Sequence, residues 1–201
     1  MDYLILGFLT GLSLILAIGA QNIFVIEQGL KKQYIFIVCL ICSISDFLLI
    51  FLGIFLFQYL NHFFTPTIEL VFNILLLIFL LHFIWGKIKT KVSETSFYVD
   101  SKTNNLSNIV VKTLGFTFLN PHVYSDTVFF LGNFSKSLSQ VDKYYFGAGA
   151  AISSFLFFFI IGYLSKYFSK YLKSATVWKR INYLIILFMS VLALTVLMEI
   201  I

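Results

Sequence analysis

Charged residues are scarce in this chain. Asp, Glu, Lys and Arg make up 11% of its 201 residues, whereas hydrophobic residues make up 60%. A soluble domain carries about 25% charged residues, so the shortage excludes a soluble globular protein. The mean hydropathy of +0.95 agrees with this interpretation. We therefore expect an all-α integral membrane protein, with residues 1–201 forming a single transmembrane domain in the lipid bilayer.

Cysteine and histidine are also rare, and this weighs against two function classes. The two cysteines, Cys39 and Cys42, lie in one apolar run. A membrane thiol–disulfide conductor needs a redox-active cysteine in each half of the chain, and the second half has none. A metal-cation exporter of similar architecture favours His-rich loops or paired His and acid ligands, and the polar stretch 87–108 has no His and no Cys. Both functions stay alternatives, but we expect no enzymatic activity, no cofactor and no metal site.

Six apolar segments are long enough to span a bilayer, at about residues 3–26, 34–60, 68–86, 109–132, 145–164 and 181–201. The fourth segment is the most polar, and a five-span alternative would leave it outside the membrane. That alternative would strand Phe116 and Phe130 in water, so we favour six spans. The stretch 87–108 is then a cytoplasmic connector between two three-helix halves, 1–86 and 109–201.

The basic residues mark loops rather than a nucleic-acid surface. The net charge is +5, and twelve of the 14 basic residues follow the first, third and fifth apolar segments. Clusters of lysine beside spans indicate cytoplasmic loops, so both termini are expected on the outer side. We expect no nucleic-acid partner.

The two halves share a short repeat. Ile44-Ser-Asp-Phe recurs as Ile152-Ser-Ser-Phe, and Gly7-Phe recurs as Gly115-Phe. Because each half has an odd number of spans, the halves have opposite orientations. Two inverted three-helix repeats are the plan of many secondary transporters.

Each half also opens with an interrupted span. Gly19 stands with Gln21 and Asn22 in an apolar segment, and Asn120-Pro121 interrupts the fourth span. Glycine adds backbone freedom, and proline removes a backbone donor and clashes with the preceding turn. Two broken helices in corresponding places predict a transport site.

Asp46 and Asp126 lie deep in apolar segments, where a charge costs several kcal/mol unless it is paired, hydrated or functional. At 1.5 Å per residue they lie roughly 18 Å and 24 Å from the cytoplasmic ends of their spans, a similar level. A non-transporting scaffold does not explain two such acids. Neighbouring carboxylates do not both ionise cheaply, so a cation entering between them would release a proton.

The motifs Gly19-Ala-Gln-Asn and Leu119-Asn-Pro-His-Val-Tyr, with Ser45-Asp46, resemble those of the LysE-type lysine/arginine exporter family, in its arginine-exporter-like branch. The similarity covers nearly the whole chain, although Ser125 stands where an apolar residue such as Leu is expected. It implies a secondary-active exporter of L-arginine and/or L-lysine in the bacterial cytoplasmic (inner) membrane, driven by the ion gradient. It also implies that Asp46 and Asp126 are the functional acids. Assembly into a homo-oligomer stays open.

Polar residues at the two breaks complete the predicted site. Gln21, Asn22 and Asn120 are expected to hydrogen-bond the α-amino or carboxylate group of a basic amino acid, with polar contacts between helices as the alternative. Tyr124 and His122 flank the second break. We count Tyr124 among the binding residues and His122 as a candidate proton relay, and we interpret Glu27 as a boundary residue at the end of the first span.

Overall fold

The fold follows from the apolar segments, which form long helices. The computed structural model describes residues 2–16, 19–60, 65–89, 105–170 and 175–200, and these contain helices and no strand. The elements are α1 (Asp2–Ile15), α2 (Ala20–Lys31), α3 (Ile35–Leu60), α4 (Pro66–Lys89), α6 (Leu106–Phe118), α7 (Pro121–Tyr124), the π-helical turn η1 (Ser125–Phe130), α8 (Leu131–Phe134), the 3-10 turn η2 (Ser135–Ser137), α9 (Gln140–Ser169) and α10 (Ala175–Ile200).

Four helices of the described chain are long and apolar enough to cross a membrane, and α1 with α2 would make a fifth span bent by 82°. The four are Ile35–Phe57, Pro66–Lys89, Gln140–Ser169 and Lys179–Met198. In the predicted fourth span, α6 is a shorter apolar helix and is followed by a break. An all-helical membrane protein is therefore confirmed. The predicted connector 87–108 is helical at its two ends, and residues 90–104 lie outside the described residues.

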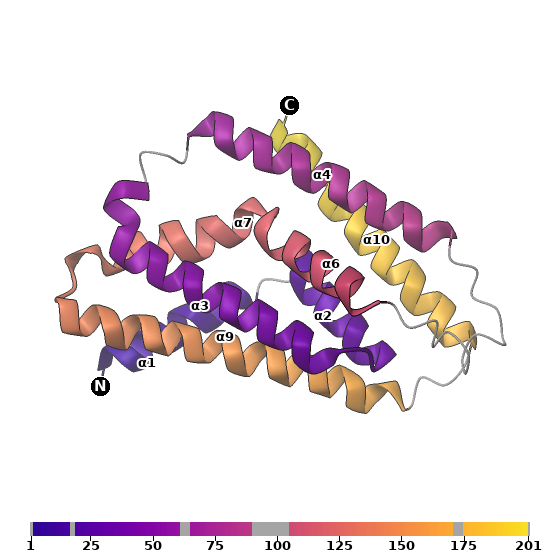
Figure 1. Cartoon of the computed structure of the whole chain (residues 1–201), viewed down its shortest axis with the longest axis horizontal. Helices are drawn as coiled ribbons and strands as arrows, with labels where there is room; N and C mark the ends of the chain where they lie inside the picture. The colour runs from indigo at the N-terminus through magenta and orange to yellow at the C-terminus, as the bar shows by residue number, and fades with distance from the viewer. Residues whose placement is uncertain (1, 17–18, 61–64, 90–104, 171–174, 201) are drawn as a thin grey trace.

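Two groups of helices lie side by side (Figure 1). The long helix α9 packs against α1, α2 and α3, and α3 packs in turn against α6, η1 and α8. The helices α4 and α10 pack against each other along the other edge. The two broken segments, α1–α2 and α6–α8, thus lie within the bundle, which suits them because only protein or water can satisfy the backbone groups at a break.

Small residues let the helices approach closely at two crossings. A Cβ atom added to Gly149 of α9 would lie 2.0 Å from the carbonyl oxygen of Leu4 in α1, and one added to Gly7 would lie 2.0 Å from that of Phe146. Gly53 of α3 and Gly132 of α8 meet in the same way, since a Cβ atom on Gly132 would lie 2.7 Å from the Gly53 carbonyl oxygen. Backbone contact through glycine is a usual basis of helix association in membranes.

The core is aromatic and aliphatic, and both cysteines belong to it. Cys39 and Cys42 are free and fully buried, and the Cys39 thiol donates a hydrogen bond of 3.2 Å to the Phe158 carbonyl oxygen of α9. They pack as small apolar residues do. The outward faces of α4 and α10 carry exposed leucines such as Leu81, Leu184 and Leu187, as expected for surfaces that meet lipid.

Replacing Gly149 by Ala tests the close crossing of α1 and α9. The added methyl group overlaps the Leu4 backbone, so the helices must separate, and we expect a loss of about 1–3 kcal/mol of stability. The measurement is thermal unfolding of the purified protein in detergent. Gly86→Ala is the matched control, because a Cβ atom at Gly86 has no neighbour within 4 Å. Equal melting temperatures for the two variants would contradict the prediction.

Candidate substrate cavity

A cavity of about 420 Å³ lies where the two broken segments meet. It is bordered by α1 and α2 on one side and by α7 and η1 on the other, with α3, α4, α9 and α10 completing the walls. The breaks are close neighbours, since a Cβ atom on Gly19 would lie 4.0 Å from the Asn120 side-chain nitrogen. The cavity therefore sits at the contact between the first and second halves of the chain.

The first break lies between Ile15 and Ala20. Gly19 caps α2 with φ −108° and ψ −179°, an extended conformation that any residue can adopt, so the predicted use of glycine's freedom is wrong. The Asn22 side-chain nitrogen donates a hydrogen bond of 2.9 Å to the Ile15 carbonyl oxygen, which the break deprives of its partner in the helix. Asn22 thus holds the two half-helices together across the break.

The second break lies at Leu119–Asn120. The Asn120 side chain caps α7 by accepting a hydrogen bond of 3.1 Å from the His122 amide, and Pro121 takes the first helical position, where no amide is needed. The Tyr124 hydroxyl donates a bond of 2.9 Å to the Phe118 carbonyl oxygen. Tyr124 therefore bridges this break as Asn22 bridges the first.

The chain after the second break continues as the π-helical turn η1, which carries Asp126. Such turns widen a helix locally and are frequent at functional sites. The Thr127 hydroxyl donates a bond of 2.6 Å to the Val123 carbonyl oxygen within this region. The sequence pointed to the break at Pro121 but contained no signal for this turn.

The two predicted acids line the same cavity from opposite halves. Asp46 of α3 is only 5% exposed, and its carboxylate accepts a hydrogen bond of 2.7 Å from the Ser154 hydroxyl of α9. Asp126 is half-buried and also borders the cavity. Ser154 was missed as a site residue, although the repeat places it in the position that corresponds to Asp46.

Most of the other predicted residues border the cavity too, namely Gly19, Gln21, Asn22, Asn120 and His122. Pro121 and Tyr124 are not among its lining residues, because one occupies the start of α7 and the other points to the Phe118 carbonyl. The Gln21 side-chain nitrogen is buried, with the Cys42 thiol as its neighbour and no oxygen acceptor in the described structure. It is a donor that a bound molecule could satisfy.

The rest of the wall is apolar. Leu14, Ile50, Leu76, Leu80 and Val196 surround the polar groups. Within the parts of the chain that the structure describes, no three His, Cys, Asp or Glu side chains gather in a way that would hold a metal ion. The cavity thus offers two carboxylates and several amides in an apolar enclosure, a set of groups suited to an organic cation that also has polar atoms.

The sequence matches the family model described as LysE type translocator over residues 12–200. The chain belongs to the LysE type translocator family. Residues on both sides of the cavity lie within the matched range, from Gly19 to Val196.

Curated relatives of this LysE-type chain are arginine exporters. It is 32% identical over 191 residues to the arginine exporter protein ArgO of Salmonella typhimurium, covering 92% of this chain and 88% of the relative. It is 33% identical over 189 residues to the arginine exporter protein ArgO of Pectobacterium carotovorum, covering 89% of this chain and 88% of the relative. No solved structure matches the chain.

Tyr124→Phe tests the hydrogen bond across the second break. Removing the hydroxyl leaves the Phe118 carbonyl, at the end of α6, without this hydrogen-bond donor. We therefore expect a loss of about 1 kcal/mol in stability. Thermal unfolding in detergent measures it. Tyr183→Phe removes the same atom from an exposed tyrosine of α10 and is the control. If both variants unfold like the parent, the Tyr124 bridge contributes nothing to stability.

Proposed function

We propose that this LysE-type protein is a secondary-active exporter of L-arginine and/or L-lysine across the bacterial cytoplasmic membrane, in exchange for protons. The observation that carries the proposal is a cavity between two broken helices with a carboxylate from each half, Asp46 and Asp126, on its wall. The relatives named arginine exporters support a basic amino acid as the substrate. Discontinuous helices around a central cavity are the usual site in secondary transporters.

The proposed architecture has six spans in two inverted three-helix repeats, 1–86 and 109–201. The packing supports it, because α1 and α2 of the first broken span lie on α9 as α6, η1 and α8 of the second lie on α3, while the third helices α4 and α10 pair with each other. The hydrogen bond between Ser154 and Asp46 joins the two corresponding positions of the repeat. With lysine-rich loops in the cytoplasm, both termini lie on the outer side.

In the proposed bound state the cationic side chain lies between Asp46 and Asp126. The α-carboxylate lies at the start of α2, where the positive end of the helix dipole and the Gln21 side-chain nitrogen, which has no oxygen acceptor, favour an anion. Asn120 and Asn22 line the same space and complete the polar contacts of the amino acid. A substrate with both charges therefore spans the cavity from α2 to α3 and η1.

Exchange follows from competition for the two acids. When no substrate is bound, a proton held by the pair neutralises one of its two carboxyl groups, and an arriving cation favours ionisation of that group and releases the proton. His122, which lines the cavity beside Asp126, relays it. Exporting a cation alone against an inside-negative potential costs about 2.3 kcal/mol per 100 mV, and one-for-one exchange with an inward proton removes that cost.

Asp46→Asn and Asp126→Asn should each reduce arginine efflux from loaded cells by at least about a hundredfold, because an amide can neither bind the cation nor carry the proton. Efflux of labelled arginine and labelled lysine, normalised to the protein in the membrane, is the measurement. Asp142→Asn is the control, since Asp142 lies outside the cavity in the first turn of α9, where it accepts a hydrogen bond from the Ser139 hydroxyl. Full efflux in both cavity variants would overturn the proposal.

One-for-one exchange also predicts which part of the proton gradient drives transport. In vesicles, nigericin, which collapses the pH difference, should stop arginine movement. Valinomycin with equal potassium on both sides, which collapses the electrical potential, should leave it unchanged because no net charge crosses. Transport that follows the potential and ignores the pH difference would exclude electroneutral exchange.

A further inference from the structure

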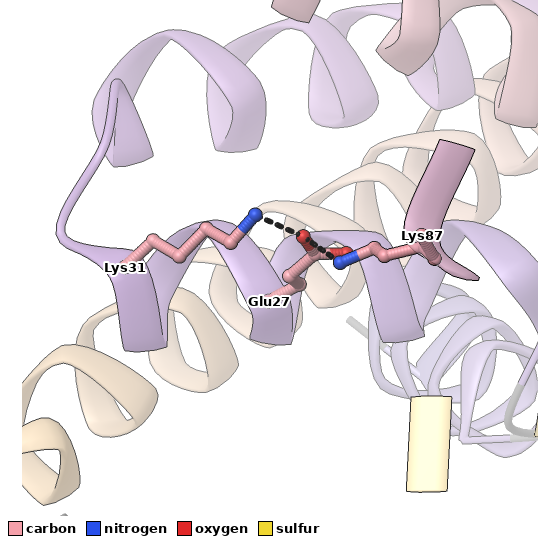
Figure 2. Close-up of polar contacts among 3 residues, drawn as sticks. All are labelled: Glu27, Lys31 and Lys87. Atoms are coloured by element: carbon pink, nitrogen blue, oxygen red, sulfur yellow. Dashed lines mark hydrogen bonds and ion pairs between the residues drawn. The ribbon is translucent and has the colours of Figure 1, made fainter. Parts of the chain in front are cut away.

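A second buried carboxylate, Glu27, lies outside the cavity and was wrongly interpreted as a boundary residue. It is 2% exposed and forms ion pairs with two lysines. Lys31 is one turn further along α2, at 2.6 Å, and Lys87 comes from α4. Figure 2 shows the two ammonium groups reaching the same carboxylate oxygen from opposite sides.

The other oxygen of this carboxylate, Oε2, is buried and has no hydrogen-bond partner in the described structure. An ionised carboxylate offers two oxygens with about four acceptor positions. The negative charge of Glu27 is therefore paired with lysines, but its second oxygen can still accept a hydrogen bond. A further donor, such as a guanidinium or ammonium group, would find an open acceptor there.

Glu27 lies outside the cavity, between its lining residues and the end of α2 that leads to a lysine-rich loop. Along α2, Gln21 borders the cavity, and Glu27 follows six residues later, about 9 Å along the helix axis. The same order occurs on α4, where Leu80 borders the cavity and Lys87 lies two turns further on. The charged layer thus caps one end of the cavity.

Three phenylalanines separate the cavity from this charged layer. Phe24, Phe83 and Phe116 are buried, and each ring contacts the other two, with centroids 5.0 to 6.3 Å apart. They come from α2, α4 and α6, the helices that also carry the charges. Lys87 and Lys112 lie over the Phe83 ring at 5.3 and 6.0 Å from its centroid. Along α2 and α4, the aromatic rings and the bridging ion pair therefore lie between the cavity-lining residues and the lysine-rich ends of the helices.

We propose that Glu27 is a second binding site for the cationic side chain of the substrate, on its way from the cytoplasm to the cavity, and that Lys87 occupies this site while the path is closed. This inference rests on the proposed export of basic amino acids. The arriving cation replaces Lys87 on Glu27, so the buried carboxylate is never left unpaired. The link between α2 and α4 is then broken, and Phe24 and Phe83 separate.

Two features suit Lys87 to this exchange. It lies in the last turn of α4, close to the end of the helix, and a lysine side chain is long enough to carry its ammonium group past a helix end to water. Its partner is on another helix, so its departure uncouples the helices, whereas Lys31 stays paired with Glu27 within α2. The aromatic rings favour passage of a cation because each ring face attracts positive charge.

The first test measures access to the cavity. A cysteine placed at Leu192, an apolar wall residue of α10, reports entry of a membrane-impermeant methanethiosulfonate reagent that carries a trimethylammonium group. In inside-out vesicles, Lys87→Met should raise its labelling rate by at least about tenfold over the Leu192→Cys parent, and Lys31→Met should not. The chain without Leu192→Cys accounts for labelling of the buried native thiols.

The second test measures binding at the cytoplasmic face. Glu27→Gln should raise the KM for arginine by about tenfold or more with a smaller effect on kcat, and Glu27→Asp should recover part of the affinity. A purely structural ion pair would lower the amount of folded protein and leave KM and the labelling rate of the folded protein unchanged. That result overturns this inference alone if the unsubstituted protein transports arginine. An unsubstituted protein that moves no arginine overturns the proposed export, and the labelling rates still decide whether Lys87 closes the path.

Discussion

The need to satisfy backbone groups at two helix breaks inside a bilayer underlies the rest of this structure. A break leaves carbonyl and amide groups without helical partners, and lipid supplies none. Here Asn22 donates to the Ile15 carbonyl across the first break, and Tyr124 donates to the Phe118 carbonyl across the second. At the second break Asn120 also accepts a hydrogen bond from the His122 amide. Because the breaks face each other rather than lipid, two of these polar side chains, Asn22 and Asn120, also form part of the wall of a cavity. The site is thus a direct result of how the broken helices are stabilised.

The buried carboxylates on the two sides of Phe24, Phe83 and Phe116 have different partners. Asp46 accepts a hydrogen bond from a hydroxyl and borders the cavity, so its charge state can respond to a ligand. Glu27 forms ion pairs with two ammonium groups, one from α2 and one from α4. In the proposed export cycle, a cationic substrate would displace a lysine from Glu27 and then a proton from Asp46 and Asp126. This order keeps the desolvation cost of each carboxylate compensated throughout.

Particular residues show how far the sequence could predict the site. Asp46 and Asp126 stood out because charge is costly in apolar segments, and Asn120-Pro121 because proline interrupts a helix. These signals are local, so they were visible without a fold. The position of Ser154 depended on the repeat, and the π-helical turn that carries Asp126 had no signal at all. Glu27 was misjudged because a glutamate near the end of a span is ordinarily solvated, and its burial depends on a lysine 60 residues away.

Hydropathy and residue type therefore determined the all-helical membrane fold, the places of the breaks and the identity of the acids. These follow from the energetics of single residues in a bilayer, which act whatever the partners are. Only the tertiary structure decided that Asn22 and Tyr124 bridge the breaks, that Asp46 receives the Ser154 hydroxyl, and that Glu27 and Lys87 meet. Such contacts join distant segments and depend on how closely helices cross, which glycines such as Gly149 set through backbone contact.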